Sequence, residues 1–385
     1  MNNFSFVNPV KIIFGKNTIG EISNEIPKDK KVLMIYGGGS IKKNGVYDQV
    51  MNALKAYSVF EFEGIEPNPH YETCMKAVSL IKEKGIDFLL AVGGGSVIDA
   101  TKFIAAAACF EREDPWVLLS KHAEIQAALP FGTILTLPAT GSEMNSGAVI
   151  TRAETKDKLA FNSTLVFPKF SVLDPEVTYT LPVKQIGNGV VDTFVHVVEQ
   201  YITYPTNSLL QYMFAESILK TLVTEGPKTL ENPTDYDVRA NLMWASTWAL
   251  NGWIACGVPQ DWATHRIGHE LTALYGLDHG QTLAIVLPGV LTFMKKQKEE
   301  MIIRMGEQVF GIYNNMNKEE RIKLSIESLE NFFEEMGIKT HLSDYGLGTE
   351  AVEAVSNRIS ERGWQLGEHH NISGKEVKEI LMMRL

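Results

Sequence analysis

Three histidines fall close together in the stretch WATHRIGHELTALYGLDHG, residues 262–280. His265 and His269 are four residues apart, which places them on one face of a helix, and His279 follows a glycine-containing break. Neutral imidazoles are the commonest side-chain ligands of metal ions in proteins. The spacing therefore indicates a metal site formed by a helix and the segment that follows it.

A second ionisable pair occurs in GNGVVDTFVHVVEQYIT, residues 187–203, where Asp192 and His196 are also four residues apart. Their neighbours are mostly apolar, so this helix is expected to be buried. A buried carboxylate is costly unless it is paired or bound to a metal. One interpretation is that Asp192 forms an ion pair with a neighbouring residue. The other is that Asp192 and the histidines together form a site for Zn²⁺ or Fe²⁺.

The spacing does not decide which histidines join Asp192 and His196. If His265 and His279 are ligands, His269 is left as a free imidazole beside the metal, where it would suit proton transfer. If His269 is the ligand instead, His265 lies along the same helix face and His279 has no assigned role. Both arrangements remain open at this point.

The first half of the chain alternates apolar strands with helices. Strands are expected in KVLMIYGGGS (31–40), DFLLAVGGGS (87–96) and FGTILTLPAT (131–140), and helices around 44–56 and 71–85. Such continuously apolar strands are typical of a parallel sheet covered on both faces. Long helical segments follow LDPEVTYTLP (173–182). We therefore expect an α/β dinucleotide-binding domain with a parallel sheet at 1–180 and an all-α metal-binding domain at 181–385.

Two of the expected strands end in the sequence GGGS. In the second, Gly94, Gly95 and Ser96 precede a helix, where free backbone amides and the helix dipole suit a phosphate group. A plain tight turn has the same sequence, and the G-x-G-x-x-G fingerprint is absent because Ile98 stands at its third glycine. Asp99 and Lys102, one turn further on, belong to residue types that are more usual on a helix surface.

The earlier stretch, YGGGSIKKNG, bears on cofactor choice. Enzymes that select NAD place an acidic side chain after a strand, against the ribose 2′-hydroxyl. The corresponding place here holds four small residues and then two lysines: Gly37, Gly38, Gly39, Ser40, Lys42 and Lys43. The stretch contains no carboxylate to repel a 2′-phosphate, so it favours NADPH, although a solvated lysine pair would have the same sequence.

Composition excludes several other classes of protein. A formal net charge of −10 argues against nucleic acid or an anionic membrane as a partner. Cys74, Cys109 and Cys256 are too few and too far apart for a disulfide framework or a Cys-x-x-Cys motif. The N-terminus lacks a signal-peptide pattern, and no window reaches the roughly 18 apolar residues of a membrane span. We expect a cytoplasmic protein.

From end to end the chain resembles the iron-type (group III) alcohol dehydrogenases, and within them the bacterial NADPH-dependent aldehyde reductases and butanol dehydrogenases. The resemblance rests on collinear segments: FGKNTIGEI, YGGGSIKKNGVYDQV, GIEPNP, LLAVGGGSVIDATKFIA, TLPATGSEMN, NGVVDTFVHVVEQY, GVPQDWATHRIGHELTALYGLDHGQTLAIVLP and HLSDYGLG. NAD-preferring relatives carry Asp at the position of Gly37, which supports NADPH here. Many relatives carry Pro after the position of His269, whereas this chain has Glu270, and this glutamate fits the aldehyde-reductase branch.

The resemblance also implies roles for individual residues. It makes Asp192, His196, His265 and His279 the ligands of one divalent metal, Zn²⁺ or Fe²⁺, and places His269 beside the substrate as a catalytic residue. It assigns the cofactor to the glycine loops and to residues along the adjoining segments: Gly37, Gly38, Gly39, Ser40, Gly94, Gly95, Ser96, Asp99, Thr136, Thr140, Ser142 and Lys158. Met144, Asn145, Trp253 and Trp262 are further candidates for the substrate pocket.

The resemblance implies reduction of short-to-medium aliphatic aldehydes to primary alcohols by NADPH, in a homodimer, with a metal ion polarising the carbonyl. A polyol dehydrogenase of the glycerol type is one alternative. A metal- and NAD-dependent lyase of the dehydroquinate-synthase type is another, but the apolar segment TWALNGWIACGVPQDWATH lacks the basic residues that its phosphate-bearing substrate would require. A non-catalytic NADPH-binding protein would be favoured only if the site held no metal.

Overall fold

The computed structural model describes residues 1–112, 114–313 and 316–385 and divides into two compact units. The α/β unit contains Val7–Leu181 and Thr234–Met243. The helical unit contains Met1–Phe6, Pro182–Pro233 and Trp244–Leu385.

A six-stranded sheet forms the centre of the α/β unit, with strand order β1-β8-β5-β4-β2-β3 and every pairing parallel. Its strands are β1 (Lys11–Phe14), β2 (Lys31–Tyr36), β3 (Ser58–Phe62), β4 (Phe88–Gly94), β5 (Phe131–Leu137) and β8 (Phe170–Leu173). The chain proceeds from β2 outward to β3, and then returns to β4 on the other side of β2. The order therefore reverses between β2 and β4, which is where open α/β sheets bind ligands.

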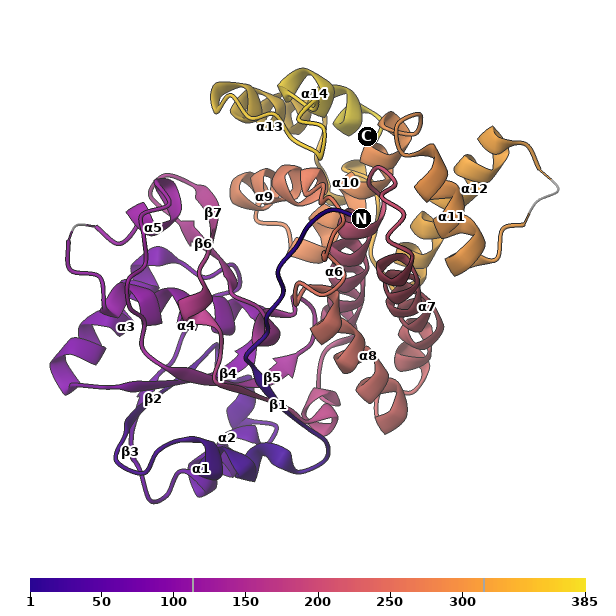
Figure 1. The fold of residues 1–385 in the computed structure, drawn as a ribbon. Helices are drawn as coiled ribbons and strands as arrows, with labels where there is room; N and C mark the ends of the chain where they lie inside the picture. Colours follow the sequence, from indigo (N-terminus) through magenta and orange to yellow (C-terminus); the bar gives the residue numbers. More distant parts are fainter. Residues whose placement is uncertain (113, 314–315) are drawn as a thin grey trace. The chain divides into compact units, whose positions relative to one another are not determined.

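Helices cover both faces of this sheet, as the continuously apolar strands predicted (Figure 1). Alternate residues of β2 separate two cores: Leu33 and Ile35 pack with α3 and α4, and Val32 and Met34 pack with α1 and α2. The helices of the unit are α1 (Ile22–Glu25), α2 (Val46–Ala53), α3 (Tyr71–Lys84), α4 (Gly95–Ala108) and α5 (Val117–Ser120). Short 3₁₀ helices lie at Thr18–Glu21, Ser40–Lys42, Ser142–Met144, Thr164–Val166 and Pro175–Thr178.

An antiparallel hairpin of β6 (Gly147–Arg152) and β7 (Asp157–Asn162) forms a separate two-stranded sheet that the sequence analysis did not anticipate. It packs on α4, so it lies over the helix that follows the second glycine loop. This position brings residues of the hairpin into contact with the first turns of α4.

The helical unit is built from long helices, as expected: α6 (Val183–Tyr201), α7 (Leu209–Glu231), α9 (Ala263–Tyr275), α10 (His279–Phe293), α11 (Glu299–Phe310), α12 (Lys318–Glu335), α13 (Thr349–Glu361) and α14 (Gly374–Met382). A 3₁₀ helix occupies Ser343–Tyr345, and the residues of α8 (Tyr236–Ala249) divide between the two units. The fold class is therefore the predicted one, a parallel α/β sheet unit with an all-α unit.

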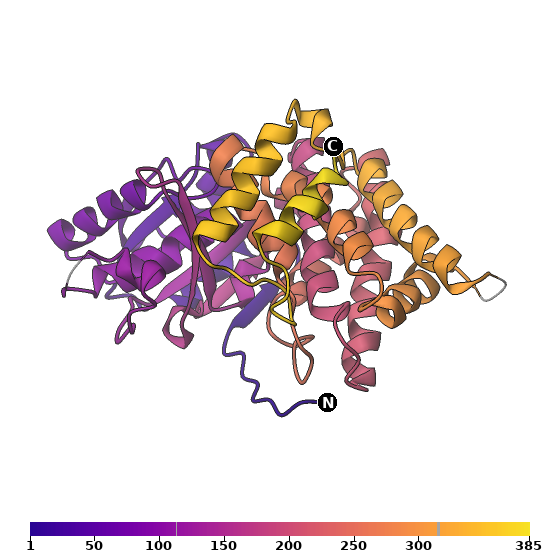
Figure 2. The ribbon, with the colours of Figure 1, turned by 90° about the horizontal axis from the view of Figure 1, so that it is seen from above.

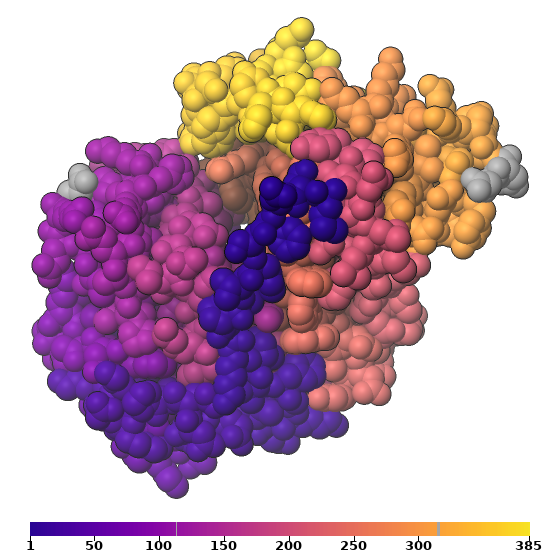
Figure 3. All heavy atoms as spheres, in the orientation of Figure 1, coloured from indigo at the N-terminus to yellow at the C-terminus, as the bar shows by residue number. Residues whose placement is uncertain are grey.

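The core of the helical unit lies around α6, which is buried along most of its length from Ile186 to Tyr201. α6 packs against α7 and α10, and α10 packs against α9. α13 and α14 lie side by side (Figure 2), and their residues form a continuous part of the unit's surface (yellow in Figure 3). Among the described helices, none has the length and apolar character needed to cross a bilayer.

Candidate metal centre and dinucleotide loops

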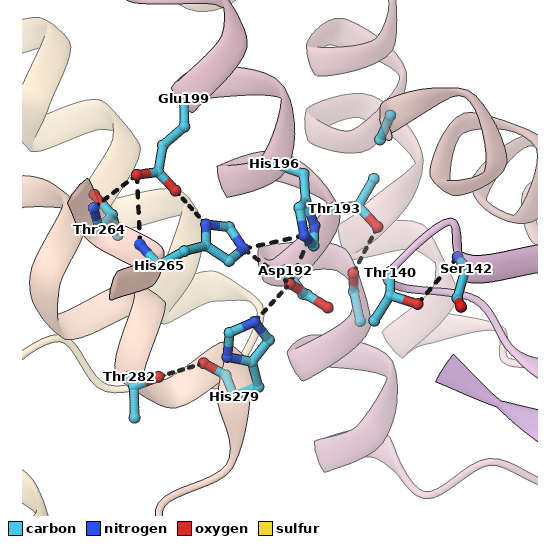
Figure 4. A network of polar contacts seen from close by, with 12 residues as sticks. Thr140, Ser142, Asp192, Thr193, His196, Glu199, Thr264, His265, His279 and Thr282 are labelled. Atoms are coloured by element: carbon cyan, nitrogen blue, oxygen red, sulfur yellow. Dashed lines mark hydrogen bonds and ion pairs between the residues drawn. The ribbon is translucent and has the colours of Figure 1, made fainter. Parts of the chain in front are cut away.

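Side chains from three helices of the helical unit converge on Asp192 (Figure 4). The Oδ1 atom of Asp192 lies 3.2 Å from Nδ1 of His196, 3.7 Å from Nε2 of His279 and 4.0 Å from Nε2 of His265. The Nε2 atoms of His196 and His265 are 3.0 Å apart. Potential ligand atoms of Asp192, His265 and His279 all lie within 4.8 Å of one another. The structure thus brings together the four residues that the resemblance singled out.

Local backbone features explain why these side chains meet. Asp192 and His196 share one face of α6, and His265 lies in the first turn of α9. α9 ends at Gly276, whose φ of 71° is in the left-handed region that glycine tolerates, and α10 then begins at His279. Asp278 and Gln281 form a capping box at this start, which fixes the position of His279.

The site is buried and its imidazoles are suited to bind a cation. Asp192 and His196 are each 4% exposed. Burial lowers the pKa of His196 to about 4, and the opposing effect of Asp192 does not offset it. Three imidazoles that present lone pairs and one carboxylate form a donor set that both Zn²⁺ and Fe²⁺ accept. The residues present therefore fit a divalent metal.

His269 lies at the edge of this cluster. Its ring centroid is 5.3 Å from that of His279 and 6.2 Å from that of His265, and the residue is buried. The indole of Trp262 packs edge-on against His265, at 5.3 Å between ring centroids, and lies near His196. Two of the residues predicted to contribute to the site therefore adjoin the potential ligands.

Other residues proposed for the substrate pocket have different surroundings. Trp253 packs against the rings of Phe6 and Phe214. Asn145 accepts a hydrogen bond from Lys102 Nζ at 2.8 Å and donates one to the backbone of Gly141. Met144 is buried in the 3₁₀ helix Ser142–Met144.

Glu199 is a contributor that the sequence analysis missed. Its carboxylate contacts the Nδ1 atom of His265 and accepts the backbone N–H of Thr264 at 2.7 Å. Glu199 stands one helical turn after His196 on the same apolar helix. The argument that singled out Asp192, a carboxylate on a buried helix, applies equally to it.

Glu270, the position where many relatives have proline, also has a defined role. Its buried carboxylate pairs with Arg358 at 2.5 Å and with Arg362 at 3.4 Å. The ion pairs join α9 to the end of α13 and leave the potential metal ligands untouched.

In the α/β unit, both glycine loops lie at the carboxyl-terminal ends of neighbouring strands of the sheet. β2 and β4 are paired neighbours, with Tyr36 opposite Val92, so Gly37 and Gly93 continue adjacent strands in the same direction. Gly39 has a φ of 86°, and Ser40 begins a 3₁₀ helix. β4 extends to Gly94 and α4 begins at Gly95, so the second loop leads directly into a helix N-terminus.

Close packing explains two of these glycines. A Cβ atom on Gly93 would lie 2.5 Å from a methyl carbon of Val97, and one on Gly95 would lie 2.4 Å from the hydroxyl of Thr140. The absence of side chains lets the backbone of α4's first turn pack against the segment after β5. A helix N-terminus at this place offers free backbone amides of the kind that bind phosphate groups.

Asp99 and Lys102 make hydrogen bonds within the unit and are not on a solvated helix surface. Lys102 is fully buried, and its Nζ donates to Ser142 at 2.8 Å, to Asn145 and to the backbone of Gly147. Asp99 accepts from the hydroxyl of Ser142 at 2.5 Å and from the amide of Val149. Burial lowers the pKa of Lys102 to about 8 and raises that of Asp99. Together they join α4 to the β6–β7 hairpin.

The remaining predicted cofactor residues lie nearby on the same unit. Thr136 is in the last part of β5, and Thr140 accepts the amide of Ser142 at 3.2 Å. Lys158, on β7, donates to the side-chain oxygen of Asn68 at 2.9 Å. The backbone N–H of Asn68 in turn donates to the hydroxyl of Ser96 at 3.3 Å. Asn68 therefore connects two predicted cofactor residues, although the sequence analysis gave it no role within the segment GIEPNP.

The surroundings of Lys42 include acidic residues that the stretch itself does not contain. The stretch after β2 holds no carboxylate, but Glu61 and Glu63 come from neighbouring β3 and the residue after it. Lys42 Nζ lies 2.8 Å from Glu63, and the hydroxyl of Tyr36 donates to Glu61 at 2.8 Å. The bond to Glu63 raises the pKa of Lys42. A carboxylate is thus present beside the lysine expected to attract a 2′-phosphate.

Comparison with known proteins supplies the family. Residues 9–175 match the family model described as iron-containing alcohol dehydrogenase, and residues 187–385 match the model of the C-terminal part of the Fe-containing alcohol dehydrogenase family. The chain belongs to the iron-containing alcohol dehydrogenase family. As a member of that family it is an oxidoreductase of alcohols and aldehydes.

Individual members of the iron-containing alcohol dehydrogenases are similar along their whole length. The NADPH-dependent aldehyde reductase YqhD of Escherichia coli is 56% identical, with 97% of each chain covered. A probable NADH-dependent butanol dehydrogenase 1 of Bacillus subtilis is 41% identical, with 100% of each chain covered. The crystal structure of E. coli YqhD matches with a TM-score of 0.98 and 54% identity, covering 100% of this chain and 99% of that one.

Proposed function

We propose that this protein reduces short-to-medium aliphatic aldehydes to primary alcohols with NADPH at a divalent-metal site. The observation that carries the proposal is the convergence of Asp192, His265 and His279, from three helices, at a point where the first two are buried and His279 is partly buried. The similarity to an NADPH-dependent aldehyde reductase over nearly the whole chain supports the substrate class and the cofactor.

In this proposal Asp192, His196, His265 and His279 hold the metal. When bound, Zn²⁺ or Fe²⁺ supplies Lewis acidity to a carbonyl oxygen and NADPH supplies the hydride. The protein's residues contribute a preorganised set of one carboxylate and three imidazoles, whose lone pairs hold the cation in place. Their burial also excludes bulk water from the reacting atoms.

The glycine loops bind the dinucleotide in the same proposal. Gly94, Gly95 and Ser96 lie at the N-terminus of α4, where backbone amides suit the pyrophosphate. Gly37, Gly38, Gly39 and Ser40 adjoin the adenosine ribose, and Asp99, Thr136, Thr140, Ser142 and Lys158 line the remainder of the cofactor. Gly37, in place of an acidic residue, favours NADPH over NADH, and Lys42 offers its charge to a 2′-phosphate in exchange for its ion pair with Glu63.

His269 completes the proposed machinery as the group that delivers a proton to the product alkoxide. Histidine is the side chain that most often serves as a general acid or base in enzymes. Its buried ring, which lies against that of His279, supports this role.

We further propose a cytoplasmic homodimer with no nucleic-acid or membrane partner. The net charge of −10 supports the absence of polyanionic partners. Light scattering of the purified protein tests the assembly: a mass of twice 42.9 kDa is expected, and a monomer mass would contradict it.

The experiment that tests the activity is the initial rate of NADPH oxidation with butanal. It is run on metal-replete protein and on the same preparation after chelation, with NADH in parallel. Metal-dependent turnover that favours NADPH is expected. Absence of turnover despite bound metal would overturn the reaction, and turnover that favours NADH would overturn only the cofactor preference.

A further inference from the structure

The carboxylate of Glu199 lies deep inside the helical unit, on the side of His265 opposite to Asp192 (Figure 4). Its side chain is 3% exposed. One oxygen contacts Nδ1 of His265, and the other accepts the amides of Thr264 at 2.7 Å and of His265 at 3.4 Å. Glu199 therefore engages both the ring of His265 and the backbone of the helical turn that carries it.

This contact determines which nitrogen of His265 carries its proton. When it is ionised, the Glu199 carboxylate accepts hydrogen bonds only, so its partner Nδ1 of the neutral imidazole carries the proton. The lone pair is then on Nε2, the atom that faces His196 at 3.0 Å and Asp192 at 4.0 Å. A carboxylate behind a ligating histidine also increases the basicity of the ligating nitrogen.

A buried ion-pair cluster holds Glu199 and the start of α9 in place. The amide of Asp261 donates to the carbonyl of Glu199 at 2.9 Å, and the Asp261 carboxylate accepts the amide of Ala263 at 2.8 Å. Lys298, with a side chain 1% exposed, pairs with Asp261 at 2.6 Å and with Glu368 at 2.7 Å. It also donates to the carbonyl of Ile202, just after α6. The end of α6 and the start of α9 are thereby fastened to each other.

We propose that Glu199 is a positioning residue of the metal centre, which sets metal affinity by holding His265 with Nε2 toward Asp192. The proposal rests on the proposed function, since it takes His265 as a ligand. The Asp261–Lys298–Glu368 cluster keeps Glu199 at the correct distance from His265.

Glu199→Gln tests the proposal because it retains the size of the side chain and removes its second acceptor. A glutamine has one carbonyl oxygen to face two donors, the Nδ1–H of His265 and the amide of Thr264. If its NH₂ group faces His265, the ring must carry its proton on Nε2, which blocks the ligating nitrogen. If its NH₂ group faces Thr264, two donors oppose each other and the turn must shift.

Glu216→Gln is the matched control. Glu216 is also a buried carboxylate on a helix of this unit, and it accepts from the hydroxyl of Tyr201 and pairs with Arg304 at 2.5 Å. It is a structural contact away from the potential ligands. A general effect of losing a buried carboxylate would appear in both variants, whereas an effect on the metal should appear in Glu199→Gln alone.

Zn²⁺ affinity is measured by competition with a chromogenic chelator, and the visible spectrum of the Co²⁺-loaded protein reports the ligand geometry. We expect Glu199→Gln to bind Zn²⁺ about 10- to 100-fold more weakly than wild type, with an altered Co²⁺ spectrum, and Glu216→Gln to match wild type in both. Equal affinity and an unchanged spectrum in Glu199→Gln would overturn the proposal. If the wild-type protein does not bind one Zn²⁺ ion per chain, the proposed function itself would be overturned.

A second variant covers the case in which Glu199→Gln does not fold. Glu199→Asp keeps the charge but retracts the carboxylate by one methylene, so it leaves the His265 ring without its partner. Circular dichroism and thermal unfolding of the metal-free variants establish that they are folded. A folded Glu199→Asp with wild-type Zn²⁺ affinity would overturn the proposal, and a loss of affinity would support it.

Discussion

Gly280 packs against the backbone of Asn188 so closely that a Cβ atom on it would lie 2.7 Å from the Asn188 carbonyl oxygen. Gly280 immediately follows His279, and Asn188 is four residues before Asp192. The close approach of these two helices is therefore what brings His279 to Asp192.

Gly280→Ala should separate α10 from α6 and move His279 away from Asp192. Because the opposing atoms are backbone and cannot rotate aside, we expect a loss of stability of about 1–3 kcal/mol together with weaker metal binding. Urea unfolding and metal titration measure the two effects. Gly20→Ala is the control, since nothing lies within 4 Å of a Cβ atom there. Wild-type metal affinity in Gly280→Ala would show that this packing does not position His279.

Asp192→Asn should reduce metal retention and aldehyde reduction together. The substitution removes the only negative charge among the four proposed ligands, so we expect metal affinity to fall by more than about 100-fold, beyond the range typical of outer contacts. Metal content after dialysis and the rate of NADPH oxidation are the measurements. Asp174→Asn, which alters a buried helix-capping carboxylate of the α/β unit, is the control. Retained metal with normal turnover would refute the assignment of Asp192.

His269→Ala should lower turnover without releasing the metal. Loss of a positioned proton donor typically costs about 10²-fold or more in rate. Metal content and kcat are measured on the same preparation, and His269→Asn provides a variant that restores bulk but not the titrating ring. If metal is lost from both variants, His269 is a ligand and the assignment of its role is wrong.

The parallel sheet was predictable because its central strands β2, β4 and β5 are mostly apolar, a pattern that burial on both faces explains. The β6–β7 hairpin was missed, and so were the four-residue strands β1 and β8. A four-residue strand has too few residues for periodicity to distinguish it from a loop. The hairpin was detectable in principle, because a short polar turn, ETK at 154–156, lies between two strand-like segments.

At the metal centre, helical spacing identified Asp192 and His196 as partners on one face, but it could not choose among the three later histidines. The convergence of His265 and His279 depends on the turn at Gly276 and on the packing of Gly280 against α6, which are tertiary features. Glu63 was overlooked for a similar reason, because it reaches Lys42 only through the pairing of β3 with β2.

The Lys42–Glu63 pair predicts opposite shifts in cofactor preference. Glu63→Gln should strengthen NADPH use because it frees Lys42 for a 2′-phosphate, and Lys42→Met should weaken it. Each change in KM for NADPH is expected to be roughly two- to fivefold, the size typical of an exposed ion pair. NADH, which lacks the phosphate, serves as the internal control, and added salt should reduce both effects. Equal shifts for NADPH and NADH would place the pair away from the 2′ position.

The buried His196 predicts that the metal-free protein is acid-sensitive. Burial lowers its pKa to about 4 in the folded state, against 6.5 when unperturbed. Because the folded pKa is the lower one, its contribution to stability is fully present above pH 6.5 and is lost as the pH falls toward 4. The shift corresponds to about 3 kcal/mol in the free energy of unfolding.

Urea unfolding of the metal-free protein at several pH values in that window measures the effect, with His196→Gln as the comparison. The variant should lose less stability on acidification because it has no imidazole to protonate there. His369→Gln, which changes an exposed histidine, should follow wild type. Parallel curves for wild type and His196→Gln would contradict the prediction, since acid sensitivity would then arise from other groups.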